Sequence, residues 1–319
     1  MAKGKYAALS GKLVAVIGGS GFFGGHVAQE LLSCGARLRI VSRHPGRAWH
    51  LKPLAGLGQI QFLPGDVLKP ATLDYALAGC DAVVNLVGAF AGDLDGLQGR
   101  GVGRIAVAAK AGGATAFVHV SALGADAESA IAYNRTKAEG EAAVLAAFPA
   151  ATILRPSVLF GEDDKFINLF AGLIAMAPVL PVFAPQAKLQ PLFVDDAAEA
   201  VVAALADPAA HGGKAYDIAG PEAISMIDLN RRIGLAQGRD RLFLELPDAV
   251  SGAFATATGW LPGAPLTRQQ WALLKDGNVL SGKDGLKVLG ITPRPLSLFL
   301  DKWMVRYRKH GRFGAKARA

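Results

Sequence analysis

The stretch Lys12-Leu-Val-Ala-Val-Ile-Gly18-Gly19-Ser20-Gly21-Phe22-Phe23-Gly24 decides the fold of this chain. Its first half is a continuous apolar run, as expected for a parallel strand that is buried on both faces. Its second half spaces three glycines as G-x-x-G-x-x-G and opens a helical stretch that runs to Ser33. A strand, a glycine-rich turn and a helix in this order predict a pyrophosphate cradle at the helix N-terminus, where free N–H groups favour anions.

The glycines of this turn have separate expected roles. Gly18 permits the tight turn, Gly21 lets backbone amides approach the phosphates, and Gly24 lets the helix pack close to the strand. Three spaced glycines alone are a weak signal in a chain with 39 glycines, so the prediction depends on the strand–turn–helix context. We expect the nucleotide to contact the whole turn, namely Gly18, Gly19, Ser20, Gly21, Phe22, Phe23 and Gly24.

Strand-like apolar runs alternate with helical stretches through the first half of the chain. Further strands are expected at Arg37–Val41, Gln59–Leu63, Asp81–Val87, Ala116–Val120 and Thr152–Leu154. Helices are expected near 70–78, 98–111 and 134–147. This alternation predicts an α/β fold with a doubly wound parallel sheet of the Rossmann type.

The later half is less regular. A strand-like run, Leu189–Val194, leads into a helix at Asp195–Leu205, and Lys214–Ile218 has the pattern of a further short strand. Ser225 and Thr267 are good N-cap residues and predict helix starts. We therefore expect a dinucleotide-binding domain at 1–158, a smaller, partly helical C-terminal lobe at 159–301 that returns about 189–218 to the core, and a basic tail at 302–319.

The formal net charge of +8 is concentrated at the C-terminus. Residues 302–319 carry seven Lys or Arg and no acid, interleaved with Trp303, Met304, Tyr307 and Phe313. Such a segment is either a solvated chain end or a docking element for an anionic surface, which is a lipid headgroup layer or an acidic partner. A nucleic-acid partner is not expected, because no nucleic-acid-binding fold accompanies the charge.

The composition favours a soluble bacterial protein in a reducing compartment. The two cysteines, Cys34 and Cys80, are expected to be buried packing residues, and they are too few for a metal site. No segment resembles a signal peptide or a membrane span, since the apolar stretch 172–183 is short and contains Pro178 and Pro181. We therefore expect a cytoplasmic protein.

The end of the second expected strand predicts the choice of dinucleotide. Its continuation, Val41-Ser42-Arg43-His44-Pro45-Gly46-Arg47, contains no acid that could bind the ribose hydroxyls of NAD. Arg43, with Arg47 as a second candidate, can pair with a 2′-phosphate, so NADP(H) is favoured over NAD(H). Asp66 is expected to accept a hydrogen bond from the adenine amino group, with Val67 beneath the ring. Alternatively, Asp66 forms only an Asx-turn in its loop.

Several further motifs follow one another along the chain. They are Gly65-Asp66-Val67, Asn85-Leu86-Val87-Gly88, Val118-His119-Val120-Ser121, Tyr133-x-x-x-Lys137, Leu154-Arg155-Pro156-Ser157 and Phe160-Gly161. Their order resembles that of the extended or atypical short-chain dehydrogenases. In finer detail, Tyr133-Asn-Arg-Thr-Lys137 and the segment 147–166 are similar to the NADPH-binding accessory subunits of respiratory complex I, the alpha-subcomplex subunit 9 family, in their bacterial form.

This resemblance implies a tightly held NADPH with a structural or sensing role. It also implies partners in the peripheral arm of complex I and a position at the cytoplasmic face of the inner membrane, where the basic tail would contact the membrane surface. The motifs add to the expected cofactor site Leu86, Val87, Gly88, Ser121, Tyr133, Lys137, Pro156 and Ser157.

The same resemblance indicates a candidate catalytic group. In short-chain dehydrogenases a Tyr phenol exchanges a proton with the substrate oxygen, and a Lys one helical turn later holds the nicotinamide ribose and lowers the phenol pKa. Tyr133 and Lys137 have this spacing, and Ser121 would hydrogen-bond the same oxygen. Active members carry a richer Ser/Thr cluster around that serine and a different helix start at Gly96–Gly103. Little or no turnover is therefore expected.

Two other functions stay open. An active NADP-dependent reductase or epimerase on a small or lipid-like substrate would use Tyr133 as its acid–base group. An NADP(H)-responsive regulatory protein would bind the nucleotide and a partner without turnover. The nearly apolar run Ile167–Phe183 suits a protein contact or an apolar ligand better than a sugar nucleotide, unless it is ordinary core.

Overall fold

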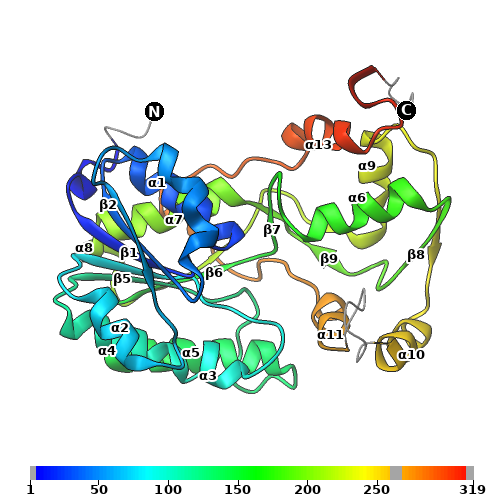
Figure 1. The fold of residues 1–319 in the computed structure, drawn as a ribbon. Coiled ribbons are helices and arrows are strands. Elements are labelled where there is room, and N and C mark those ends of the chain that lie inside the picture. Colours follow the sequence, from blue (N-terminus) through cyan, green and yellow to red (C-terminus); the bar gives the residue numbers. More distant parts are fainter. Residues whose placement is uncertain (1–4, 259–267, 314–319) are drawn as a thin grey trace. The chain divides into compact units, whose positions relative to one another are not determined.

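The computed structural model describes residues 5–258 and 268–313 of the chain (Figure 1). Its backbone forms two compact units. The first contains the described residues of Met1–Pro156, Val194–Ile218 and Gly282–Thr292, and the second those of Ser157–Phe193, Ala219–Ser281 and Pro293–Ala319. The expected first domain, with its boundary at 158 and a return near 189–218, differs from the first unit mainly by the late segment 282–292.

The first unit is built on a seven-stranded sheet with the order β11-β6-β5-β4-β1-β2-β3. All neighbouring strands run parallel, which confirms the predicted doubly wound Rossmann-type sheet. Ligands of such sheets bind at the carboxyl ends of the strands where the order reverses, which here is between β1 and β4. The strands are β1 (Leu13–Ile17), β2 (Arg37–Ser42), β3 (Ile60–Pro64), β4 (Ala82–Asn85), β5 (Ala116–Val120), β6 (Thr152–Pro156) and β11 (Ala215–Ile218).

Helices cover both faces of this sheet (Figure 1). On one face α1 (Phe22–Ser33) packs against α7 (Val194–Ala206), and on the other lie α2 (Pro70–Leu77), α4 (Gly101–Ala111) and α5 (Ala132–Ala147). The helix expected at 98–111 is interrupted, because the backbone at Gly99 leaves the helical region at ψ −123°. Shorter elements complete the unit: η1 (Ala7–Leu9), η2 (Pro45–Leu54), α3 (Leu94–Gln98), α8 (Pro208–His211) and α12 (Gly285–Val288), which packs against β11.

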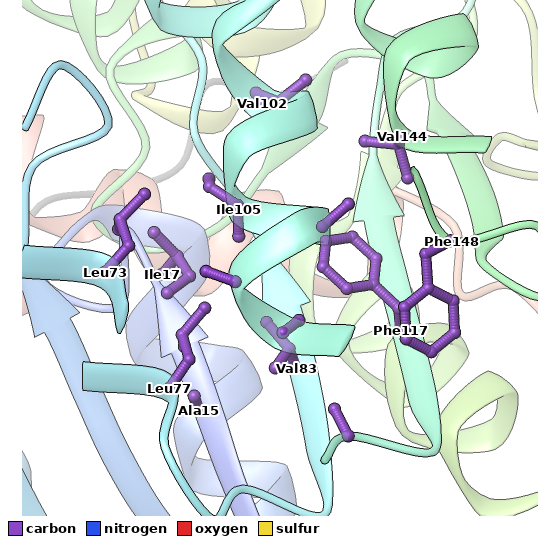
Figure 2. Close-up of a cluster of buried hydrophobic side chains, with 14 of the residues drawn as sticks. Ala15, Ile17, Leu73, Leu77, Val83, Val102, Ile105, Phe117, Val144 and Phe148 are labelled. Atoms are coloured by element: carbon purple, nitrogen blue, oxygen red, sulfur yellow. The ribbon is translucent and has the colours of Figure 1, made fainter. Parts of the chain in front are cut away.

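Figure 2 shows the core between the sheet and the layer of α2, α4 and α5. Phe117 of β5 is almost fully buried there, and its ring centre lies 5.6 Å from that of Phe148. Fully burying one large apolar side chain contributes about 1.5–3 kcal/mol. This core therefore fixes the strand ends from which the loops of the site begin. Its labelled members are Ala15, Ile17, Leu73, Leu77, Val83, Val102, Ile105, Phe117, Val144 and Phe148.

The second unit combines helices with three short strand pairs. α6 (Phe166–Met176) packs against α9 (Met226–Ala236), which begins at the N-cap Ser225 as expected. The pairs are β7 (Leu159–Phe160) with β10 (Leu192–Phe193), β8 (Val179–Val182) with β13 (Leu242–Glu245), and β9 (Lys188–Leu189) with β12 (Ile224–Ser225). The remaining elements are α10 (Asp248–Thr258), α11 (Arg268–Asp276), α13 (Ser297–Trp303), η3 (Met304–Tyr307) and η4 (Gly311–Phe313).

One expectation for the later half differs from the structure, and another is not tested by it. The strand expected at Leu189–Val194 is two short strands, β9 and β10, because the backbone leaves β9 at Gln190-Pro191 and Pro191 has no N–H to give to a ladder. The helix start expected at Thr267 lies outside the described residues. Both cysteines, Cys34 and Cys80, are free and buried, and burial raises the pKa of each thiol.

The basic C-terminal segment was expected to be a separate tail, but its described part, which ends at Phe313, packs on the second unit. Met304 is buried, the Tyr307 hydroxyl donates to Asn168 Oδ1 at 2.8 Å, and the Arg308 guanidinium donates to the Ala236 carbonyl at 2.8 Å and 3.0 Å. These contacts make residues 302–313 part of the second unit. In the part of the chain that the structure describes, the helices are too short or too polar to cross a bilayer.

Candidate functional site

The glycine turn has the geometry of an anion cradle. Gly18 has φ +81°, a backbone conformation that favours glycine. Gly21 is the N-cap of α1, and no side chain caps the helix there, so the first amides of α1 remain available to a ligand. A Cβ on Gly24 would lie 2.5 Å from Gly19 Cα and 2.6 Å from Gly18 O. The helix therefore approaches the turn as closely as its backbone allows.

The end of β2 presents a hydroxyl and two cations. Ser42 is buried, and its Oγ has no hydrogen-bond partner among the described residues. A buried polar atom without a partner costs about 1–3 kcal/mol. Arg43 and Arg47 are exposed and form no ion pair within the described parts of the chain. This donor set fits a nucleotide with a phosphate at this position, because the ligand would supply the acceptors that the protein lacks.

Asp66 lies in the loop after β3. Its Oδ1 accepts a hydrogen bond from the Leu68 amide at 3.0 Å, which is the expected Asx-turn. The adenine contact predicted for Asp66 is compatible with this turn, since a carboxylate can accept several hydrogen bonds. Val67 is buried and belongs to the core cluster that contains Leu73 and Val102.

Two backbone amides hold the loop after β4. The Leu86 amide donates to the Ile17 carbonyl at 3.0 Å, which anchors the loop beside β1. The Val87 amide donates to Asn85 Oδ1 at 3.0 Å. At Gly88 an added Cβ would lie 3.3 Å from Lys137 Nζ. Of the three predicted cofactor residues in this loop, Val87 and Gly88 therefore lie next to the Lys137 side chain.

Lys137 is the most strongly constrained group of the site. Its side chain is buried, and Nζ donates to the carbonyl of Val120 at 3.2 Å and to that of Val87 at 3.4 Å. Burial lowers the pKa of Lys137 to about 8, although the nearby Glu141 carboxylate raises it. A ribose hydroxyl that approached Nζ would find an ammonium group already aimed by two carbonyls.

Tyr133 lies one helical turn before Lys137. Its ring stacks on that of Phe90, with ring centres 4.7 Å apart and planes 13° apart. Burial raises the pKa of Tyr133 to about 12, so the phenol is protonated at neutral pH. Ser121, at the end of β5, is buried, and its Oγ has no partner in the described chain. The phenol and the serine hydroxyl are therefore not bonded to each other, and each remains available for an oxygen of a ligand.

Two pairs of buried polar side chains, Gln98 with Thr136 and Asn85 with His119, escaped the sequence predictions. Gln98 accepts from the Ala89 amide at 2.8 Å and donates to Thr136 Oγ1 at 3.0 Å, which ties the β4 loop to α5. Asn85 donates to His119 Nδ1 at 2.9 Å. Burial, and to a smaller extent the positive charge of Lys137, hold the pKa of His119 well below its usual value. In the sequence His119 is part of a motif that gives it no role of its own, and Gln98 stands in a Gly-rich segment without a sign of burial.

The last two predicted cofactor residues are placed differently. Pro156 ends β6 and pairs with Ile218 of β11. Ser157 begins the second unit, and its hydroxyl donates to the Gln190 carbonyl at 2.5 Å. That hydroxyl is already engaged within the second unit. The residues that the first unit gathers are the glycine turn, the end of β2, the β4 loop, Ser121 and the Tyr133–Lys137 pair.

Comparison with known proteins identifies the family. An NAD(P)H-binding family matches residues 18–168, and the RmlD substrate binding domain matches residues 125–256. NADH dehydrogenase (ubiquinone) 1 alpha subcomplex subunit 9, mitochondrial, from Mus musculus is 30% identical, covering 97% of this chain and 84% of its own length. A ceramide reductase from Caulobacter vibrioides is also 30% identical, covering 79% of this chain and 80% of its own length.

The chain belongs to the NAD(P)-binding, extended short-chain dehydrogenase-like family that includes alpha-subcomplex subunit 9. This confirms the resemblance found in the motifs. Solved structures of other proteins share the fold. Triphenylmethane reductase from Citrobacter sp., complexed with NADP(H), superimposes with a TM-score of 0.75 at 19% identity, covering 91% of this chain and 99% of that one. An NADPH-dependent quinone oxidoreductase from Escherichia coli, complexed with NADPH, superimposes with a TM-score of 0.72 at 20% identity. The match covers 92% of this chain and 99% of that one.

Proposed function

We propose that this chain is a subunit of a membrane-bound NADH:quinone oxidoreductase in which it holds NADP(H) in a structural or sensing role. The observation that carries the proposal is the similarity to the subunit 9 proteins along 97% of the chain, a span that includes both units. The subunits of the peripheral arm would be its partners. The exposed cations of 302–313 would face the inner membrane from the cytoplasmic side.

NADP(H) is favoured over NAD(H) by the groups at the end of β2. Ser42 offers a buried hydroxyl that lacks a partner, and Arg43 and Arg47 add charge with no carboxylate beside them. A 2′-phosphate would satisfy the hydroxyl and pair with a guanidinium, whereas the 2′-hydroxyl of NAD would leave both cations unpaired.

Identification of the nucleotide and of the assembly tests this function. The tagged chain should be purified gently from its host, and one portion denatured so that any released nucleotide can be identified and counted by mass spectrometry. The other portion should be run on a native gel stained for NADH dehydrogenase activity. Near-stoichiometric NADP(H), together with migration in the active complex, is the expected result. A nucleotide-free chain that migrates alone would refute the proposal.

Charge reversal at Arg43 tests the cofactor preference. Arg43→Glu should weaken NADPH binding at least about tenfold more than NADH binding, because a charge-assisted pair is replaced by repulsion. Lys110→Glu makes the same change at an exposed site on α4 and serves as the control. Isothermal titration of both nucleotides measures the difference. Equal weakening of NADPH and NADH by Arg43→Glu would remove the 2′-phosphate role from this residue.

A reductase is the second candidate function, and the geometry around Ser121 favours it. The protonated Tyr133 phenol and the free Ser121 hydroxyl could both donate to one carbonyl oxygen, and the Lys137 ammonium could hold the ribose and stabilise the phenolate that remains. A bound NADPH would supply the hydride. The relatives named ceramide reductase and NAD(P)H azoreductase add support for this candidate.

Tyr133→Phe distinguishes the two candidates. It removes the phenolic proton and retains the stacking on Phe90. A reductase should lose about two to four orders of magnitude in rate, measured as NADPH oxidation with a long-chain carbonyl substrate. The nucleotide-holding subunit should keep its nucleotide and its place in the complex. Loss of assembly in the Tyr133→Phe variant would contradict both roles.

A further inference from the structure

The sheet of the first unit ends at β3, which pairs with β2 alone among the described strands. The Leu38 amide donates to the Gln59 carbonyl, and the Gly65 amide donates to the Ser42 carbonyl. In a parallel pair, alternate residues turn their N–H and C=O groups towards the neighbouring strand. Ile60 and Phe62 therefore direct their backbone donors and acceptors away from β2.

β3 lacks the usual protection of an edge strand. Its sequence, Ile60-Gln-Phe-Leu-Pro64, has no charged residue, and its proline stands at the last position, after the outward amides of Ile60 and Phe62. Natural proteins normally cover such an edge, shorten it or place Lys, Glu or Pro on it. A length of five residues is typical of a strand that supports pairing. This edge is a template for another strand.

A groove of about 850 Å³ lies along this edge. Side chains from both faces of β3 line it. Because side chains alternate along a strand, Gln61 and Leu63 face one side, with Arg39 of β2 and Tyr75 of α2, while Ile60 and Phe62 face the other, towards η2. Two aromatic side chains stand beside the groove and are largely exposed, Trp49 at 67% and Tyr75 at 72%. The lining residues are Arg39, Trp49, Lys52, Ile60, Gln61, Phe62, Leu63, Tyr75 and Ala78.

The charge of the groove indicates its occupant. Arg39 and Lys52 line it, and no Asp or Glu does. The Arg39 guanidinium donates to the carbonyls of Ala76 and Ala78 and forms no ion pair with a carboxylate within the described chain. We propose that β3 binds an extended, acidic and apolar segment of a partner protein as an additional strand of the sheet. Main-chain bonds to Ile60 and Phe62 would give affinity, and the aromatic and basic side chains would select the sequence.

This inference does not depend on the proposed function, and none of the groove residues belongs to the nucleotide site. It is tested by residue-resolved hydrogen exchange on the purified chain. The probe is a blocked peptide of alternating Val and Thr with Glu at both ends, and the matched peptide carries Lys in place of Glu. With the Glu peptide, the amides of Ile60 and Phe62 should exchange at least about tenfold more slowly, whereas those of Gln61 and Leu63, already bonded to β2, should not change.

Two comparisons make the test specific. The Lys peptide should bind at least about fivefold more weakly, since attraction to two cations becomes repulsion. Phe62→Lys should abolish the slowing by placing a charge on the edge, whereas Val107→Lys, the same kind of change at an exposed site on α4, should retain it. The proposal fails if the exchange of Ile60 and Phe62 is unchanged at saturating peptide, or if the two peptides bind equally. It also fails if protection appears without peptide and rises with chain concentration, since the occupant is then a second copy.

Discussion

Helix α1 contains two neighbouring glycines, Gly24 and Gly25, that differ in the space available for a side chain. A Cβ on Gly24 would meet only backbone atoms, at 2.5 Å from Gly19 Cα, 2.6 Å from Gly18 O and 2.7 Å from Gly19 C. Backbone cannot move aside as a flexible side chain can. Gly24→Ala must therefore lift the helix N-terminus away from the turn. A Cβ on Gly25 would find its nearest neighbour, His50 Nε2, at 3.8 Å, which is an ordinary contact.

From these distances we expect the two substitutions to change the free energy of unfolding in opposite directions. Overpacking of this kind costs about 1–3 kcal/mol, so Gly24→Ala should destabilise the nucleotide-free chain by that amount. Gly25→Ala should stabilise it by up to about 1 kcal/mol, because alanine is the better helix former. At roughly 2–4 °C per kcal/mol for a large domain, Tm should fall by several degrees in the first variant and rise slightly in the second.

Thermal unfolding followed by circular dichroism, with urea unfolding as a second measure, checks the stability of both variants. Titration with NADPH checks the cradle, because a displaced helix N-terminus no longer directs its amides at the phosphates. Gly24→Ala should bind NADPH at least about tenfold more weakly, since misplacing charge-assisted bonds costs more than 1.4 kcal/mol. If Gly24→Ala were as stable as Gly25→Ala, the close approach of helix and turn would be wrong.

Three other substitutions test the electrostatics and the C-terminal segment. Because burial lowers the pKa of Lys137 from 10.5 to about 8, the nucleotide-free chain should gain stability as pH rises from 8 to 10.5. Lys137→Met should abolish that rise, seen by urea unfolding across pH. Arg155 pairs with the buried Glu141 carboxylate at 2.5 Å. Arg155→Leu should therefore lower the free energy of unfolding by about 3 kcal/mol, and a decrease below about 0.5 kcal/mol in urea unfolding would contradict a buried charge. Tyr307→Phe removes the bond to Asn168 and should cost about 1 kcal/mol by the same measure.

The sheet was predictable because its strands are short runs dominated by apolar residues that alternate with helical stretches. The run before Gly18 is β1, and Arg37–Val41 differs from β2 by one residue. A strand buried on both faces leaves this pattern in any sequence. The second unit was harder to predict, since its strands are two to four residues long and alternate too briefly to define a period. The basic segment was predicted as a separate tail, because its charge and composition do not reveal that Tyr307 and Arg308 form long-range hydrogen bonds to the second unit.

The candidate site was predictable where local geometry requires particular residues. Gly24 must lack a side chain, and Lys137 must follow Tyr133 by one helical turn, so both leave a spacing in the sequence. Gln98 leaves none, because its role depends on Ala89 and Thr136, which only the folded chain brings near it. Buried polar groups that hold a loop in place resemble surface residues until their partners are known.

The late segment Gly282–Thr292 has a consequence for synthesis of the chain. It belongs to the first unit, where Leu286 is fully buried and an added Cβ on Gly285 would lie 2.7 Å from the Asp217 carbonyl oxygen. The flank of β11 is therefore not covered until the segment 282–292 has been synthesised, more than sixty residues after β11 itself. A nascent chain that stops before that segment would leave the flank of β11 exposed, so the nucleotide-binding unit matures only after most of the second unit has been made.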